Sequence, residues 1–183
     1  LITNPLKKYY LNNFAIEKSQ IEVLPDASDP VPKFASRLPK DFYMRSKNIQ
    51  VGYIGSLYEG KGLKLIQNIY RQLPEVDFHI VGGNKEDITF WRKLINADNV
   101  KFYGFKPQNE IKYYIKEFDL CLLPNDPDVF VYDEKRNHRV NIGEFTSPLK
   151  LFDYMAHGKI ILASNLLVLK EILNSGNSIL IDY

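Results

Sequence analysis

The chain has 183 residues, of which 45% are hydrophobic and 25% are charged, and this is enough material for one well-packed globular domain. Its net charge of +2 argues against a nucleic-acid-binding protein, and no apolar run approaches the roughly 20 residues of a membrane-spanning helix. The only cysteine, Cys121, excludes an internal disulfide. It lies in an apolar run, as expected for a buried thiol in a cytoplasmic protein.

Residues 1–47 differ in character from the rest of the chain. We expect a short helix over residues 5–11, a strand over residues 21–25 and a connecting segment over the proline-rich residues 25–39. The sequence opens without a methionine and ends on an apolar run. We therefore expect a piece of a longer protein, with residues 1–47 as an N-terminal segment and interdomain connection.

From residue 48 to residue 183, short β-rich runs alternate with longer amphipathic stretches, which predicts parallel βαβ units in a doubly wound α/β sheet. Residues 125–146, rich in Asp, Asn and Arg, predict a long loop, of the kind that is functional or mobile in a compact domain. The expected strands cover residues 50–54, 76–81, 99–103, 119–123, 160–163 and 178–181, and the expected helices cover residues 63–73, 86–97, 110–118, 149–155 and 168–173.

The carboxyl ends of these strands are the places where a doubly wound sheet binds its ligand. The first strand is followed by Gly55 and Ser56, and Lys61 precedes the next helix. Glycines let the backbone approach a ligand, and a helix N-terminus beside a lysine suits a diphosphate. A glycine-rich turn with a solvated lysine explains the same residues equally well. Later strand ends contribute Gly82, Gly83, Gly104, Phe105 and Asn125.

The segment from residue 147 to residue 164 is the most specific. Proline is favoured at the first position of a helix, so Pro148 predicts a helix start and Ser147 its cap. Lys150 and Asp153 are three residues apart on one face of that helix. There the lysine can meet a phosphate and the carboxylate can accept hydrogen bonds from sugar hydroxyls. By spacing alone, an ion pair between the two on a solvated face is the better explanation.

Taken together, these segments resemble the C-terminal domain of the group 1, retaining glycosyltransferases of the GT-B fold. The resemblance covers residues 21–183. It includes the entry segment 23–29, the strand and phosphate loop 52–62, the strand ends 81–83, 99–104 and 119–124, and above all residues 147–164. It implies a Rossmann-like domain that binds a nucleoside diphosphate sugar. It also implies no cofactor and no metal, since cations and helix dipoles stabilise the departing diphosphate.

The resemblance also implies roles for single residues. Lys61 would hold the pyrophosphate, Asp153 the ribose, and Gly104 and Phe105 would lie against the base. The segment of Ser147, Pro148, Leu149 and Lys150 would present backbone N–H groups and an ammonium group to the phosphates.

Three positions depart from the family pattern. Ser56 stands where the family often has an arginine, and Lys150, Arg136 or Arg139 would supply the missing charge. The family's two acids are eight residues apart, which places Phe145 opposite Asp153, so the neighbouring Glu144 is the substitute. Glu144 and Asp153 are therefore the predicted catalytic pair, and Asp153 is one methylene shorter than the usual glutamate.

The whole protein would then be a hexosyltransferase-type enzyme of polysaccharide biosynthesis, in the cytoplasm or at the inner face of the membrane. Its partners would be the donor, an acceptor at a membrane surface and a missing N-terminal acceptor domain, without which this chain is nearly inactive. Two alternatives remain open: a nucleotide-sugar epimerase on the same scaffold, and a non-catalytic interaction domain whose glycines are only turns.

Overall fold

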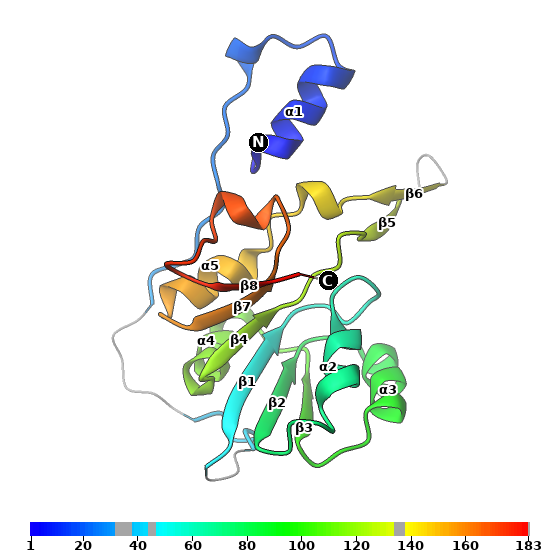
Figure 1. The fold of residues 1–183 in the computed structure, drawn as a ribbon, viewed down its shortest axis with the longest axis vertical. Coiled ribbons are helices and arrows are strands. Elements are labelled where there is room, and N and C mark those ends of the chain that lie inside the picture. The colour runs from blue at the N-terminus through cyan, green and yellow to red at the C-terminus, as the bar shows by residue number, and fades with distance from the viewer. Residues whose placement is uncertain (32–37, 44–46, 134–137, 183) are drawn as a thin grey trace.

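The computed structural model describes residues 1–31, 38–43, 47–133 and 138–182. A six-stranded, all-parallel sheet forms its centre (Figure 1). The strands are β1 (Ile49–Ile54), β2 (Val76–Val81), β3 (Val100–Gly104), β4 (Leu120–Leu123), β7 (Ile160–Ser164) and β8 (Ile179–Ile181), in the order β3-β2-β1-β4-β7-β8. In chain order this is the 3-2-1-4-5-6 arrangement of a Rossmann-like sheet, which confirms the predicted fold class.

Helices cover both faces of the sheet and give the domain two apolar cores. Helices α2 (Leu63–Ile69) and α3 (Lys85–Leu94) pack on one face, and α4 (Gln108–Glu117) and α5 (Leu149–Ala156) pack on the other (Figure 1). Because each inner strand is covered on both sides, β4 is an almost unbroken apolar run. Cys121 in that strand is fully buried, as predicted.

The sheet opens between β1 and β4. Strand β1 pairs with β2 as far as Ile54, but its pairing with β4 is confined to Val51↔Leu120 and Gly52↔Cys121. The two strands therefore separate towards their carboxyl ends. This point, where the strand order reverses, is the place at which doubly wound sheets form a ligand crevice.

The N-terminal segment contains the predicted helix, but the strand predicted at residues 21–25 is absent from the described structure. Helix α1 (Asn4–Asn13) is capped by the Thr3 hydroxyl, which accepts a hydrogen bond from the Leu6 N–H. Instead of joining a sheet, Leu24 donates its N–H to the carbonyl of Leu1 (2.8 Å). Pairing with one residue at the chain start is too short to make a strand. A single 3₁₀ turn, η1 (Lys18–Gln20), lies between the two segments.

Two other predictions were wrong. The expected helix at residues 168–173 is only the 3₁₀ turn η3 (Leu169–Glu171), because the side chains of Asn174 and Asn177 accept backbone hydrogen bonds and close a turn directly after it. The expected loop at residues 125–146 contains an antiparallel hairpin of β5 (Phe130–Asp133) and β6 (His138–Asn141), followed by the 3₁₀ turn η2 (Gly143–Phe145). Within the described ranges, no helix is long and apolar enough to cross a membrane.

Candidate functional site

The loop after β1, residues 55–62, is clamped from several sides. Gly55 donates its N–H to the Val81 carbonyl of β2 (2.9 Å), so this group belongs to the sheet. The indole of Trp91, on α3, donates to the Leu57 carbonyl (2.8 Å). The carbonyl of Gly60 accepts from the Asp126 N–H (3.0 Å), which ties the loop to the segment after β4. The loop is thus a fixed part of the sheet edge.

Backbone packing accounts for most of the glycines at the strand ends. A Cβ atom on Gly82 would lie 2.1 Å from the Gly55 carbonyl oxygen, and one on Gly62 would lie 1.9 Å from the Pro124 oxygen. A Cβ on Gly83 would meet the Leu57 side chain at 2.5 Å. These glycines let the phosphate-loop candidate pack closely against the ends of β2 and β4. Packing alone therefore explains them without a ligand.

Lys150 extends from α5 to the end of β1. Its Nζ lies 4.0 Å from the centroid of the Tyr53 ring and 3.0 Å from the position that a Cβ would take on Gly55. Burial, together with the nearby charge of Lys61, lowers the Lys150 pKa to about 7. No carboxylate in the described ranges forms an ion pair with it. The structure therefore brings Lys150 to Gly55, with the charge of Lys61 close enough to act on Lys150.

The N-terminus of α5 lacks the predicted cap. The helix begins at Leu149 with Pro148 as the N-cap residue, and no side-chain hydrogen bond caps it. Ser147 lies one residue too early to do so. Because proline has no N–H, the backbone donors that this end offers come from Leu149 and Lys150. An uncapped helix start carries a partial positive charge, which favours an anion beside it.

Tyr154 is a further residue of this region that the sequence patterns did not single out. Its hydroxyl accepts a hydrogen bond from the Ile54 N–H (2.9 Å), the group that β1 leaves unused once β4 has separated. The side chain is fully buried. Its position four residues after Lys150 places both on one helix face, and this spacing was the available signal.

Asp153 is partly buried and accepts a hydrogen bond from the Gln108 side chain of α4 (3.4 Å). No ion pair links it to Lys150 in the described structure, so the solvated pair that the spacing favoured does not form. Its backbone carbonyl lies 2.8 Å from the ring nitrogen Nδ1 of His157. The carboxylate stays close to the N-terminal end of α4 and remains accessible.

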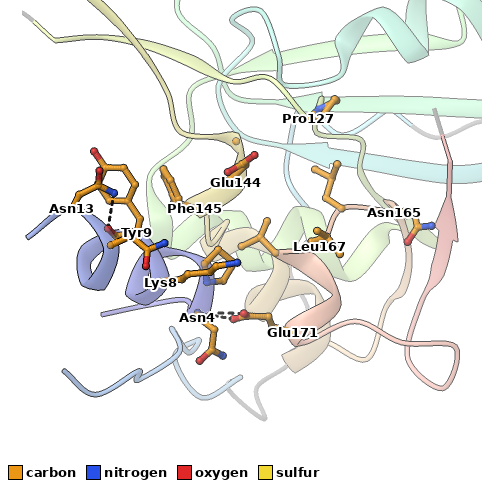
Figure 2. A pocket seen from close by; sticks show the side chains of 15 residues that line it. Asn4, Lys8, Tyr9, Asn13, Pro127, Glu144, Phe145, Asn165, Leu167 and Glu171 are labelled. Carbon is orange, nitrogen blue, oxygen red and sulfur yellow. Dashed lines mark hydrogen bonds between the residues drawn. The ribbon is translucent and has the colours of Figure 1, made fainter. Parts of the chain in front are cut away.

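A cavity of about 880 Å³ lies between α1, η2 and the segment after β7 (Figure 2). Glu144 lines it and is exposed, whereas Asp153 is not among its lining residues. The two predicted catalytic acids therefore do not share this cavity. The lining residues are Asn4, Pro5, Lys8, Tyr9, Asn12, Asn13, Pro127, Gly143, Glu144, Phe145, Asn165, Leu166, Leu167, Val168 and Glu171.

Phe145, where the family has its first acid, packs against α1. Its ring lies 5.1 Å from the ring of Tyr9, and its carbonyl accepts a weak hydrogen bond from the Thr3 hydroxyl (3.5 Å). Helix α1 is further held by its first N–H, on Asn4, which donates to both carboxylate oxygens of Glu171 (3.2 and 3.1 Å). Figure 2 shows Glu144 and Phe145 side by side on the wall opposite Asn165.

The remaining candidates differ in accessibility. Ser56 is exposed, and Phe105 is 80% exposed just beyond Gly104 at the end of β3. Asn125 is buried. Arg136 and the side chain of Arg139 lie outside the described residues. No group of His, Cys, Asp and Glu in the described part of the chain is placed to hold a metal ion.

Solved structures share this fold. Over all of this chain and 48% of its own length, the lipopolysaccharide glycosyltransferase WaaG superposes with a TM-score of 0.69 at 15% identity. The Anabaena protein Alr3699/HepE, solved with UDP and glucose, superposes over 75% of this chain and 35% of its own, with a TM-score of 0.57 at 19% identity. These likenesses concern the fold.

Sequence comparison adds the family. A teichuronic acid biosynthesis glycosyltransferase, TuaH of Bacillus subtilis (strain 168), is 25% identical over 122 residues, which are 66% of this chain and 28% of TuaH. The chain thus spans less than a third of this relative. The model of the family described as glycosyl transferases group 1 matches residues 48–183. The chain therefore belongs to the group 1 glycosyltransferases, and the sheet described above is that family's domain.

Proposed function

We propose that residues 48–183 bind the nucleoside diphosphate of a sugar donor at the carboxyl end of β1, with the diphosphate between Lys61 and Lys150. The observation that carries this proposal is the approach of Lys150 to Gly55, within reach of the charge of Lys61, from a helix whose start has no side-chain cap. Among the described residues, neither lysine has a carboxylate ion-pair partner, so their charges repel each other, and a diphosphate would relieve that repulsion. Residues 1–47 are the segment that connects to the acceptor side.

The reaction we propose is transfer of the sugar to an acceptor hydroxyl with retention at the anomeric carbon. The bond between the anomeric carbon and the diphosphate oxygen breaks, and negative charge develops on the departing phosphate. The acceptor oxygen bonds to the anomeric carbon, and its proton passes to the departing diphosphate. Lys61, Lys150 and the N–H groups of Leu149 and Lys150 would stabilise that charge. Asp153 would bond the ribose, Phe105 would lie against the base, and Glu144 would face the sugar from the cavity beside α1.

UDP is the nucleotide we expect, because the matched HepE structure holds UDP and glucose. The sugar would then be a hexose and the acceptor a growing polysaccharide on the cytoplasmic side of a membrane. This chain spans only 28% of TuaH and 48% of WaaG. We therefore propose that it binds donor but transfers sugar only together with the rest of the enzyme.

Calorimetric titration with UDP tests the proposal, with GDP, ADP and CMP as comparisons. Replacing Lys61→Met or Lys150→Met should weaken UDP binding roughly 10- to 100-fold, the value of a hydrogen bond to a charged group. Lys64→Met is the matched control, because Lys64 is an exposed lysine near the same loop that pairs with Glu59 (3.3 Å). If no nucleoside diphosphate binds, or if all three variants bind alike, the donor-site proposal is wrong and the interaction-domain alternative gains support.

A further inference from the structure

Tyr53 is a buried aromatic residue near the end of β1 whose polar and apolar parts both have specific neighbours. The residue is 0% exposed and belongs to the core on the α2 and α3 face of the sheet. Its hydroxyl donates a hydrogen bond to the Ser56 carbonyl (2.6 Å). That bond fixes the first residues of the phosphate-loop candidate to the strand that precedes it.

The same ring contacts a cation that comes from the opposite face. Helix α5 packs on the other side of the sheet, where its Leu151 and Tyr154 are buried, yet Lys150 Nζ lies 4.0 Å from the Tyr53 ring centroid. The lysine side chain must therefore pass over the carboxyl edge of the sheet. The early separation of β1 from β4 and the missing side chain at Gly55 leave room for this passage.

The position of this ammonium group needs an explanation, because nearby charge disfavours it. Lys61 is the charged group that acts on Lys150, and its positive charge repels the Lys150 ammonium. A flexible lysine relieves such repulsion by turning towards water unless something attracts it. The face of an aromatic ring carries partial negative charge and attracts a cation most strongly where water is excluded. The Tyr53 ring supplies that attraction at the point where Lys150 meets Gly55.

We propose that Tyr53 is a positioning residue of the donor site: its ring holds the Lys150 ammonium where the diphosphate binds. This inference rests on the proposed function. Tyr53 does not touch the donor, since its side chain is enclosed in the core. It acts through Lys150.

Four variants separate the ring from the hydroxyl and from plain core packing, with the UDP dissociation constant as readout. Tyr53→Leu removes the ring and should weaken UDP binding roughly 3- to 30-fold, the range expected for a buried cation–π contact. Tyr53→Phe keeps the ring and should stay within about twofold, since water can satisfy the exposed Ser56. Phe78→Leu, which removes a buried ring of the same core, should lower thermal stability and leave UDP binding unchanged. In the double variant Tyr53→Leu/Lys150→Met, the effect of Tyr53→Leu should disappear.

The outcomes distinguish this inference from the proposed function. If Lys150→Met loses UDP binding but Tyr53→Leu does not, or if the two effects simply add, Tyr53 is only a core residue and the inference is wrong. If Tyr53→Phe weakens UDP binding as much as Tyr53→Leu does, the ring is not the positioning element. If Lys150→Met itself has no effect, the proposed function fails. A ligand-free check is the ring-current shift of the Lys150 Hε protons, which Tyr53→Leu should abolish and Tyr53→Phe should retain.

Discussion

A lysine whose pKa lies near neutrality takes up a proton when an anion binds beside it. Burial, with Lys61 close by, sets the Lys150 pKa at about 7, against an ordinary value of 10.5. At pH 8 most Lys150 side chains in the unliganded protein are therefore neutral. A bound diphosphate favours the ammonium form and raises this pKa, so binding at pH 8 should consume a proton.

Titration calorimetry at pH 8, in two buffers with different ionisation enthalpies, measures this uptake directly. We expect uptake approaching one proton per UDP bound for the unmodified chain, and a fall in affinity as pH rises above 7. Lys150→Met should remove both effects, and Lys64→Met should preserve them. Equal proton uptake in the chain and in Lys150→Met would show that another group titrates.

Prediction from the sequence worked for features that depend on local patterns and failed for contacts between distant residues. The placement of Lys61, Lys150 and Asp153 followed from strand ends and helix faces, which are local patterns. The contact between Tyr53 and Lys150 did not, because it joins side chains from opposite faces of the sheet and depends on where β1 and β4 separate. The expected Ser147 cap failed because α5 starts one residue later than the proline rule placed it.

At the scale of elements, burial explains which predictions succeeded. The runs of β1, β2 and β4 are mostly apolar because helices cover both faces, and each was predicted within one residue of its observed bounds. The β5–β6 hairpin was missed because its strands stand apart from the main sheet and carry Asp, Asn and Arg. Each of these strands has only four residues, so the run Phe130-Val131-Tyr132 is too short to distinguish a strand from a loop by its pattern.

Close packing of the first loop against β2 yields a prediction for Gly82. Gly82→Ala should destabilise the domain by more than about 2 kcal/mol, since its backbone has φ 124° and the new Cβ would lie 2.1 Å from the Gly55 oxygen. The displaced loop should also weaken UDP binding. Urea unfolding and UDP titration measure the two effects.

Gly158→Ala is the matched control for this change. Gly158 also has a positive φ, of 64°, but no atom lies within 4 Å of the position that its Cβ would take. Gly158→Ala should therefore lower the free energy of unfolding only by the conformational strain, roughly 1 kcal/mol, and leave UDP binding intact. Equal losses of stability and of UDP affinity in the two variants would mean that the loop does not depend on its contact with Gly82.

At the scale of the whole molecule, a histidine joins the connecting segment to the sheet. His79 of β2 is fully buried and stacks on Phe42 at 4.5 Å. Its ring nitrogens contact the Tyr103 hydroxyl (2.8 Å) and the Gln50 side-chain oxygen (2.7 Å). The amide oxygen can only accept, so Nε2 carries the proton of the neutral ring. Burial lowers the His79 pKa to about 4.

The fold should therefore lose stability in mild acid. Because the folded pKa lies below the ordinary value of 6.5, the unfolded chain binds the proton more tightly between pH 6.5 and pH 4. We expect the free energy of unfolding to fall by about 3 kcal/mol over this window because of His79. Urea unfolding from pH 7 to pH 4 measures it. His79→Gln should flatten the pH dependence of the free energy of unfolding, and His157→Gln should not. If the unmodified chain and both variants show the same pH dependence, another group is responsible for it.

The proposed donor site and the cavity beside α1 are separate places in the molecule, and this separation allows a direct test. Lys150 reaches Gly55 at the end of β1, whereas the cavity is lined by α1, η2 and the segment after β7. Glu144 belongs to the cavity, so the transferred sugar would extend towards it while the nucleotide stays over the crevice.

The crystal structure of this chain soaked with UDP is the measurement that tests the central claim most directly. We expect diphosphate oxygens within hydrogen-bond distance of both Lys61 Nζ and Lys150 Nζ, beside the start of α5, with the ribose hydroxyls near Asp153. The account would be contradicted by UDP bound in the cavity beside α1 with its phosphates away from both lysines, or by an empty crevice at a UDP concentration that saturates binding in solution.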